Sequence, residues 1–160
     1  MSKRRRIFIH YGVDKFDPEH QYEPFWCDRK PAGLWASAEK AQYSWAEWCK
    51  AEFFHTENLE KSFKFTLSKT AKILQIHKEK DIIPYLKNYD PIKERLFFHI
   101  CGCVTDLEDR LDLEKLYAEF DGMEVFMSED YNHFHNGMFN TWDVDSICIW
   151  NLDKVKPLES

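Results

Sequence analysis

The sequence contains no run of apolar residues long enough to cross a bilayer, a span that needs about 20 of them. The basic start at residues 1–6 has the positive charge of a signal peptide, but no long apolar region follows it. Both observations count against export. We therefore expect a protein without a membrane span that is located in the cytoplasm.

The chain also has fewer positive than negative charges, with 22 Lys and Arg residues and 28 Asp and Glu residues, for a net charge of −6. This balance disfavours a broad nucleic-acid-binding face, although it leaves room for a narrow basic groove. Aromatic residues make up 16% of the chain, which favours a packed domain over a disordered one. With 160 residues we expect a single domain over 1–160, preceded by the basic tail at 1–6.

The chain has five cysteines. This odd number favours free thiols in a reducing compartment over a disulfide framework. Cys101 and Cys103 lie close to His99, which raises the question of a metal site. Their spacing matches no common zinc pattern, and the apolar residues around them are typical of a buried strand. The sequence therefore predicts no metal site.

The central feature of the chain is the stretch Gly33-Leu-Trp-Ala-Ser37, which has the pattern of a short strand leading into a helix. We expect Ser37 to cap that helix, since its hydroxyl can accept a first-turn amide. Trp45 and Trp48 would then share one helical face, near Trp35 at the strand end. Two interpretations stay open, in which these rings belong to the core or cover a flat aromatic ligand.

The remaining segments alternate between short strand patterns and helical ones, which predicts an α+β domain. Strands are expected at 7–12, 62–68, 72–76, 123–127 and 145–150, helices at 81–88 and 106–120, and irregular segments at 13–32 and 128–142. The run 92–103 is compatible with either a strand or a helix.

Three strand ends carry distinctive residues, in a fixed order along the chain. They are His10-Tyr11-Gly12, Gly33-Leu34-Trp35-Ala36-Ser37, and Trp142-Asp143-Val144-Asp145 before the last strand pattern. In this order they resemble the three motifs of the ADP-ribosyltransferase fold, in the class of diphtheria toxin and the poly(ADP-ribose) polymerases. The resemblance implies short, mostly antiparallel strands in a split sheet with two or three flanking helices, and a strand pair over 63–76.

The resemblance also implies that the substrate is NAD. His10 would hold a ribose hydroxyl, and the backbone at Gly12 would meet the nicotinamide amide. Trp35, together with Tyr43 or Trp45, would sandwich the nicotinamide ring. The cofactor-binding residues implied in this way are His10, Tyr11, Gly12, Trp35, Ser37, Tyr43 and Trp45.

Cleavage of the bond between nicotinamide and ribose leaves an oxocarbenium-like sugar, which a nearby carboxylate stabilises. The resemblance assigns this role to Asp145, with Asp143 as the second candidate. The family most often has glutamate at this position and tyrosine where this chain has Trp35, so the sequence departs from the pattern twice. The alternative is that both aspartates form a solvated pair at the start of a strand.

The stretch 128–142 would then face the acceptor of the transferred group. Its candidate contact residues are Tyr131, His133, His135 and Trp142, which could stack on nucleobases or pack on a protein. A surface turn with scattered aromatic residues is the alternative. His133 and His135 also have the spacing of a chelating pair, but no convincing third ligand accompanies them.

The expected function is that of an NAD-dependent mono-ADP-ribosyltransferase, of a small bacterial or phage-related kind. The acceptor would be RNA, DNA or protein. If the protein acts as an intracellular toxin, a cognate antitoxin or inhibitor would be a further partner. Two alternatives remain: an NAD glycohydrolase, in which water replaces the acceptor, and a non-catalytic module that binds a nucleotide, a protein or RNA.

Overall fold

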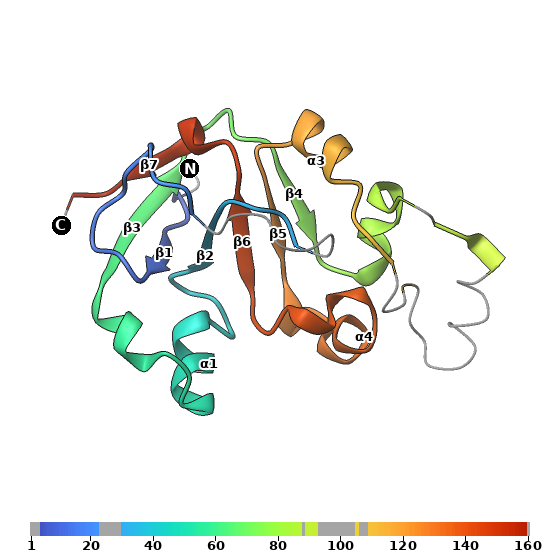
Figure 1. Cartoon of the computed structure of the whole chain (residues 1–160), viewed down its shortest axis with the longest axis horizontal. Coiled ribbons are helices and arrows are strands. Elements are labelled where there is room, and N and C mark those ends of the chain that lie inside the picture. The colour runs from blue at the N-terminus through green and yellow to red at the C-terminus, as the bar shows by residue number, and fades with distance from the viewer. Residues whose placement is uncertain (1–3, 23–29, 88, 93–104, 106–108, 160) are drawn as a thin grey trace.

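The computed structural model describes residues 4–22, 30–87, 89–92, 105 and 109–159. In this part of the chain, seven strands form one sheet in the order β4-β5-β6-β2-β1-β3-β7 (Figure 1). Their bounds are β1 Phe8–Tyr11, β2 Leu34–Ala38, β3 Ser62–Leu67, β4 Ile73–Ile76, β5 Gly122–Val125, β6 Ser146–Ile149 and β7 Val155–Pro157. All neighbouring strands are antiparallel except β4 and β5. The predicted α+β class with mostly antiparallel strands is confirmed.

The predicted strands at 62–68 and 72–76 exist, but they do not pair with each other as the resemblance implied. β3 lies between β1 and β7, whereas β4 forms the opposite edge of the sheet beside β5. β3 follows the expected alternation, because Phe63 and Phe65 are buried and Lys64 between them is exposed. Periodicity locates such a strand correctly, but it carries no information about which strand lies next to it.

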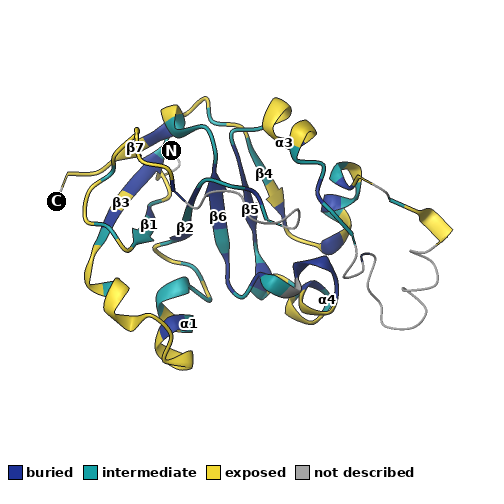
Figure 2. Ribbon diagram, in the orientation of Figure 1, coloured by how far each residue is buried: buried dark blue, intermediate teal, exposed yellow. Residues whose placement is uncertain are grey.

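The sheet has a hydrophobic cluster on each face, and β2 contributes to both. Leu34 and Ala36 belong to the cluster that also contains Phe8, Phe65 and Ile147. Trp35, which points to the opposite face, packs against the second cluster. The inner strands are consequently the most buried part of the molecule (Figure 2).

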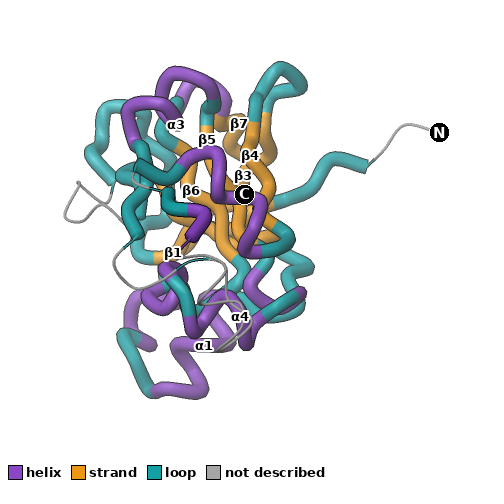
Figure 3. Tube along the Cα trace, turned by 90° about the vertical axis from the view of Figure 1, so that its right-hand side faces the viewer, coloured by secondary structure: helices purple, strands orange, loops and turns teal. Residues whose placement is uncertain are grey.

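Two helices lie at one end of the strands and a third at the other. α1 (Trp45–Glu52) and α4 (Tyr131–Asn136) lie at the lower end in Figure 1, and α3 (Leu113–Glu119) at the upper end. Figure 3, turned by 90°, shows the same arrangement. α3 is shorter than the helix predicted over 106–120, of which residues 106–108 lie outside the described part. The segment predicted as a helix at 81–88 is a 3₁₀ helix, η2 (Glu79–Tyr85).

α1 begins seven residues later than predicted, and Ser44 rather than Ser37 is its N-cap. The Ser44 hydroxyl accepts a hydrogen bond from the amide of Glu47 at 3.3 Å. Ser37 stays within β2, where its buried hydroxyl accepts from the amide of Trp45 at 3.2 Å. Ser37 therefore does bind an amide in the first turn of the helix. It does so as a residue of β2 and not as the residue that directly precedes the helix.

The stretch 128–142, predicted to be irregular, is largely helical. It contains the end of η3 (Met127–Glu129), then α4 and η4 (Met138–Thr141). Phe134, Phe139 and Trp142 are buried, each with at most 1% of its surface exposed. Trp142 was expected to face an acceptor, and instead all three rings form part of the hydrophobic cluster beside β5.

The N-terminal segment is held to the far half of the sheet by an ion pair. Arg6 donates from Nη1 and Nη2 to the two carboxylate oxygens of Glu124, each at 2.7 Å. Glu124 lies on β5 and is only 4% exposed, while the guanidinium also lies over the rings of Phe8 and Phe126. No helix in the described ranges is long and apolar enough to span a membrane.

Candidate active site

The site begins where β1 and β2 stop pairing. Backbone pairing joins Phe8 with Ala38 and Ile9 with Ser37, and it goes no further toward His10 and Tyr11. From Ala36 back to Leu34, β2 instead pairs with β6. The two strands therefore separate after two residue pairs, and the last residues of β1 stand at the edge of a gap in the sheet.

Where the two strands separate, a side chain of β1 takes the place of a backbone hydrogen-bond partner for β2. The Nδ1 atom of His10 lies 2.6 Å from the carbonyl oxygen of Trp35. A carbonyl only accepts, so Nδ1 carries the proton, and in the neutral imidazole Nε2 is the acceptor. The position of His10 on β1 and the loss of pairing with β2 together determine this tautomer.

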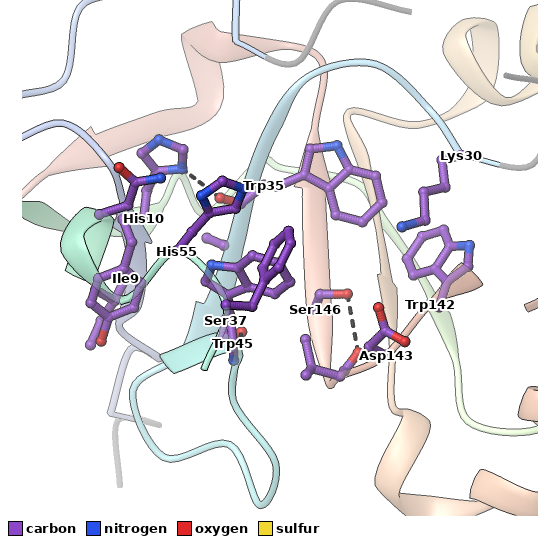
Figure 4. Close-up of a pocket in the computed structure, with 15 residues that line it drawn as sticks. Ile9, His10, Lys30, Trp35, Ser37, Trp45, His55, Trp142, Asp143 and Ser146 are labelled. Atoms are coloured by element: carbon purple, nitrogen blue, oxygen red, sulfur yellow. Dashed lines mark hydrogen bonds between the residues drawn. The ribbon is translucent and has the colours of Figure 1, made fainter. Parts of the chain in front are cut away.

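The gap opens into a pocket of about 530 Å³, within the size range of small-molecule binding sites (Figure 4). It is lined by Ile9, His10, Tyr11, Lys30, Trp35, Ala36, Ser37, Trp45, Phe54, His55, Asn58, Trp142, Asp143, Val144 and Ser146. These residues come from β1, the segment before β2, β2 itself, α1, the segment after α1, and the start of β6 with the residues that precede it. The pocket thus brings together all three motifs that carried the resemblance.

Aromatic rings form much of the pocket wall. The ring centroids of Trp35 and Trp142 lie 4.8 Å apart, and the Nζ atom of Lys30 lies 5.5 Å and 5.9 Å from these two centroids (Figure 4). Trp45 lines another part of the pocket and stacks on Trp48 at 5.1 Å with an angle of 17° between the rings. Trp48 is not among the lining residues. Two of the predicted tryptophans are therefore placed to contact a flat ligand.

Asp143 is the carboxylate that lines the pocket. Burial raises the pKa of its carboxyl above the ordinary value, while Lys30 and His135 act in the opposite direction and Glu52 adds to the rise. No hydrogen bond or ion pair of the Asp143 side chain is found within the described ranges. Its charge is thus partly desolvated and close to a lysine, an arrangement typical of functional carboxylates.

Asp145, the first candidate for this role, does not line the pocket and is only 8% exposed. Its carboxylate accepts hydrogen bonds from the amide of Ser128 at 2.7 Å, from the Ser128 hydroxyl at 2.6 Å, and from the amide of Tyr43 at 3.3 Å. Its own carbonyl accepts from the Ser37 hydroxyl at 2.9 Å. Asp145 therefore joins η3, β2 and the segment before α1, and this holds Asp143 and Ser146 beside the pocket.

The predicted cofactor residues divide into two groups. His10, Tyr11, Trp35, Ser37 and Trp45 line the pocket. Gly12 and Tyr43 do not. The Gly12 amide, expected to meet the nicotinamide, donates to the carbonyl oxygen of Lys61 at 2.9 Å. Both backbone groups of Tyr43 are bonded to Asp145, and the Tyr43 phenol has a raised pKa, chiefly because of burial and then because of Glu52.

The predicted acceptor residues are likewise separated by the fold. Trp142 lines the pocket from within the core, so it cannot present a free face to a macromolecule. Tyr131 is 43% exposed on α4, and its ring stacks on that of His135 at 5.2 Å. His133 pairs with the carboxylate of Asp130 at 2.7 Å. Of the four predicted residues, Tyr131, His133 and His135 therefore stay accessible on α4, whereas Trp142 does not.

No group of three His, Cys, Asp or Glu side chains suited to a metal ion occurs within the described ranges. Cys101, Cys103 and His99, whose spacing raised the question of a metal, lie outside the described residues. Cys49 and Cys148 are both buried, and burial raises the pKa of the Cys49 thiol.

Six lining residues have no place in the motifs from which the site was predicted: Ile9, Lys30, Phe54, His55, Asn58 and Ser146. Ser146 lies opposite Ser37 in the register set by Ala36 and Ile147, which depends on the pairing of β2 with β6 and is not visible in the sequence. The segment after α1 carries no periodic signal. Its residues reach the pocket only because the chain turns back after the helix.

Comparison with protein-family models, with curated proteins and with solved structures gives no significant match. The likeness to ADP-ribosyltransferases consequently rests on the three motifs and on their convergence in this pocket.

Proposed function

We propose that the protein is an NAD-dependent mono-ADP-ribosyltransferase that modifies a macromolecular target. The observation that carries this proposal is the meeting of His10, Trp35 and Asp143 in one pocket, although they come from three distant parts of the chain. This combination offers a ribose-binding imidazole, an aromatic surface and a carboxylate at the same place. These are the groups that cleavage of a cationic glycosidic bond requires.

In the proposed reaction, the bond between the nicotinamide nitrogen and the ribose C1′ breaks, and nicotinamide leaves as a neutral molecule. Positive charge then develops on the ribose ring. The Asp143 carboxylate stabilises that charge, which is absent from bound NAD and present in the transition state. Asp143 takes this role in place of Asp145, whose carboxylate is occupied by Ser128 and Tyr43.

The other pocket residues bind and orient NAD. Trp35 and Trp45 supply indole surfaces for the nicotinamide ring. The Nε2 atom of His10 accepts a hydrogen bond from a ribose hydroxyl, because the Trp35 carbonyl holds the proton on Nδ1. Lys30, the single lysine or arginine among the described lining residues, supplies positive charge for the diphosphate.

Incubation with NAD labelled in the adenylate half, together with separate pools of protein, RNA and DNA, tests the proposal. We expect the label to become covalently attached to one pool and nicotinamide to be released in equal amount. Asp143→Asn should reduce the rate of attachment on the order of 10²–10³-fold without loss of the fold. Release of nicotinamide with free ADP-ribose in every pool would instead identify an NAD glycohydrolase. Binding of NAD without any turnover would identify a non-catalytic module.

A further inference from the structure

The pocket contains a second histidine that the binding of NAD does not use. His55 lines it from the segment between α1 and the 3₁₀ helix η1 (Thr56–Glu60), while His10 lines it from β1 (Figure 4). The backbone of His55 is left-handed, with φ 44° and ψ 38°, and Phe53 two residues earlier is left-handed as well. Such conformations are uncommon for bulky residues and occur often at functional sites.

Two neighbours contact the half-exposed His55 ring. Its Nδ1 atom lies 3.2 Å from a carboxylate oxygen of Glu57. The ring of Phe54 meets the imidazole edge-on at a centroid distance of 4.1 Å, and Phe54 itself packs against Trp48 at 5.4 Å. Hydrogen bonds from the Glu57 backbone and from His55 lower the pKa of the Glu57 carboxyl, which is therefore ionised and accepts the Nδ1 proton.

This arrangement leaves Nε2 of His55 as the basic nitrogen. A carboxylate that orients an imidazole through Nδ1, with Nε2 directed to the reacting group, is the recurring design of a histidine general base. The other titratable or charged groups that line the pocket are His10 and Tyr11 from β1, Lys30 before β2, and Asp143 before β6. His10 differs from His55, because its Nδ1 is bound to a neutral carbonyl and not to a carboxylate.

We propose that His55, oriented by Glu57, is the general base that accepts the proton of the attacking acceptor group; this assignment rests on the proposed function. As the nicotinamide–ribose bond breaks, a bond forms between C1′ and the acceptor atom. The proton of that atom passes to Nε2 of His55 and then to solvent. NAD and the protonated acceptor thus yield nicotinamide, the ADP-ribosylated acceptor and one proton.

The assignment narrows the class of acceptor. A base is useful only where the attacking atom carries a proton that must be lost, as in a hydroxyl or a nitrogen nucleophile. A carboxylate acceptor has no such proton at neutral pH. The pocket is therefore suited to a hydroxyl or nitrogen group of the macromolecule and gives no advantage to an aspartate or glutamate side chain.

His55→Asn tests the assignment, because asparagine tolerates a left-handed backbone but cannot act as the base. The matched control is His77→Asn, which removes another half-exposed histidine bonded to a carboxylate, Glu129, at 2.7 Å outside the pocket. We expect His55→Asn to lower the turnover of ADP-ribose transfer on the order of 10²–10⁴-fold, with NAD affinity changed by less than about threefold. His77→Asn should leave both quantities unchanged.

Two further measurements separate a base from a structural residue. The pH profile of the transfer rate should differ between the wild type and His55→Asn, because the variant lacks the proposed base. Glu57→Gln should give a smaller loss in the same direction, since it removes only the orienting group. Wild-type transfer together with an unchanged rate and pH profile in His55→Asn would overturn the assignment and leave the proposed function intact. Absence of NAD turnover in the wild type would overturn both.

Discussion

The Nδ1 atom of His10 lies 2.6 Å from the backbone carbonyl oxygen of Trp35, on the neighbouring strand. The two residues stand just beyond the last backbone pair between β1 and β2, so the imidazole replaces a partner that the sheet no longer provides. One hydrogen bond thereby fixes the width of the gap and the tautomer of the histidine. Replacement of His10 by an apolar residue would affect the strand edge as well as the ligand.

The stacked pair Trp45 and Trp48 gives a direct test of the binding surface, because only Trp45 lines the pocket. We expect Trp45→Ala to weaken NAD binding about tenfold or more, since a stacking partner contributes about 1–3 kcal/mol. Trp48→Ala removes the same ring stack and should leave NAD affinity nearly unchanged. Titration calorimetry with NAD measures both variants, and equal losses would show that Trp45 acts only through packing.

The two aspartates before β6 should respond differently to the loss of charge. Asp143→Asn is expected to reduce turnover on the order of 10²–10³-fold at nearly constant NAD affinity, because it removes one electrostatic stabiliser of the transition state. Asp145→Asn should mainly reduce stability, by about 1–3 kcal/mol, since its buried carboxylate accepts bonds from Ser128 and Tyr43. Steady-state kinetics and urea unfolding of both variants distinguish these outcomes. The reverse pattern would restore Asp145 as the catalytic carboxylate.

The raised pKa of Asp143 also predicts how stability depends on pH. A group whose pKa is higher in the folded than in the unfolded state binds its proton more tightly in the folded state. The protonated group therefore stabilises the fold, and this stabilisation is lost as the pH rises through the pKa of the folded state. At neutral pH the ionised, partly buried carboxylate therefore destabilises the fold. We expect Asp143→Asn to unfold at a higher temperature than the wild type at pH 7. The difference should disappear at a pH below the ordinary pKa of aspartate, about 3.9. A difference that is independent of pH would contradict this explanation.

The ion pair between Arg6 and Glu124 should be important for stability, because it joins the N-terminal segment to β5. Arg6→Ala leaves the 4%-exposed Glu124 carboxylate without its bidentate partner. We expect a loss of about 3 kcal/mol, near the lower end of the range for a broken buried pair, since Arg6 is half-exposed. Chemical denaturation measures the loss. Lys64→Ala, which breaks the exposed pair with Glu39, is the control and should have a much smaller effect.

Several features of the protein follow from local patterns in its sequence. The alternation of Phe63 and Phe65 with polar residues locates β3, because each residue of a strand faces the side opposite to its neighbours. The stretch around Gly33 to Ser37 likewise forms β2. His10 and Trp35 line one pocket, as expected from their motifs at strand ends, but Asp145, the carboxylate expected beside them, does not.

Other features were decided only by contacts between distant segments. Asp143 and Asp145 are equally acidic in the sequence, and Asp145 is withdrawn from the pocket because Ser128 and Tyr43 bind its carboxylate. The segment from 128 to 142 became helical because burying Phe134, Phe139 and Trp142 against the sheet outweighed its weak local preference. His55 lies in the pocket because the chain turns after α1, and no periodic pattern in the sequence predicts that turn. Local patterns determine where strands form, whereas the partners of a polar side chain depend on which segments the packed core brings together.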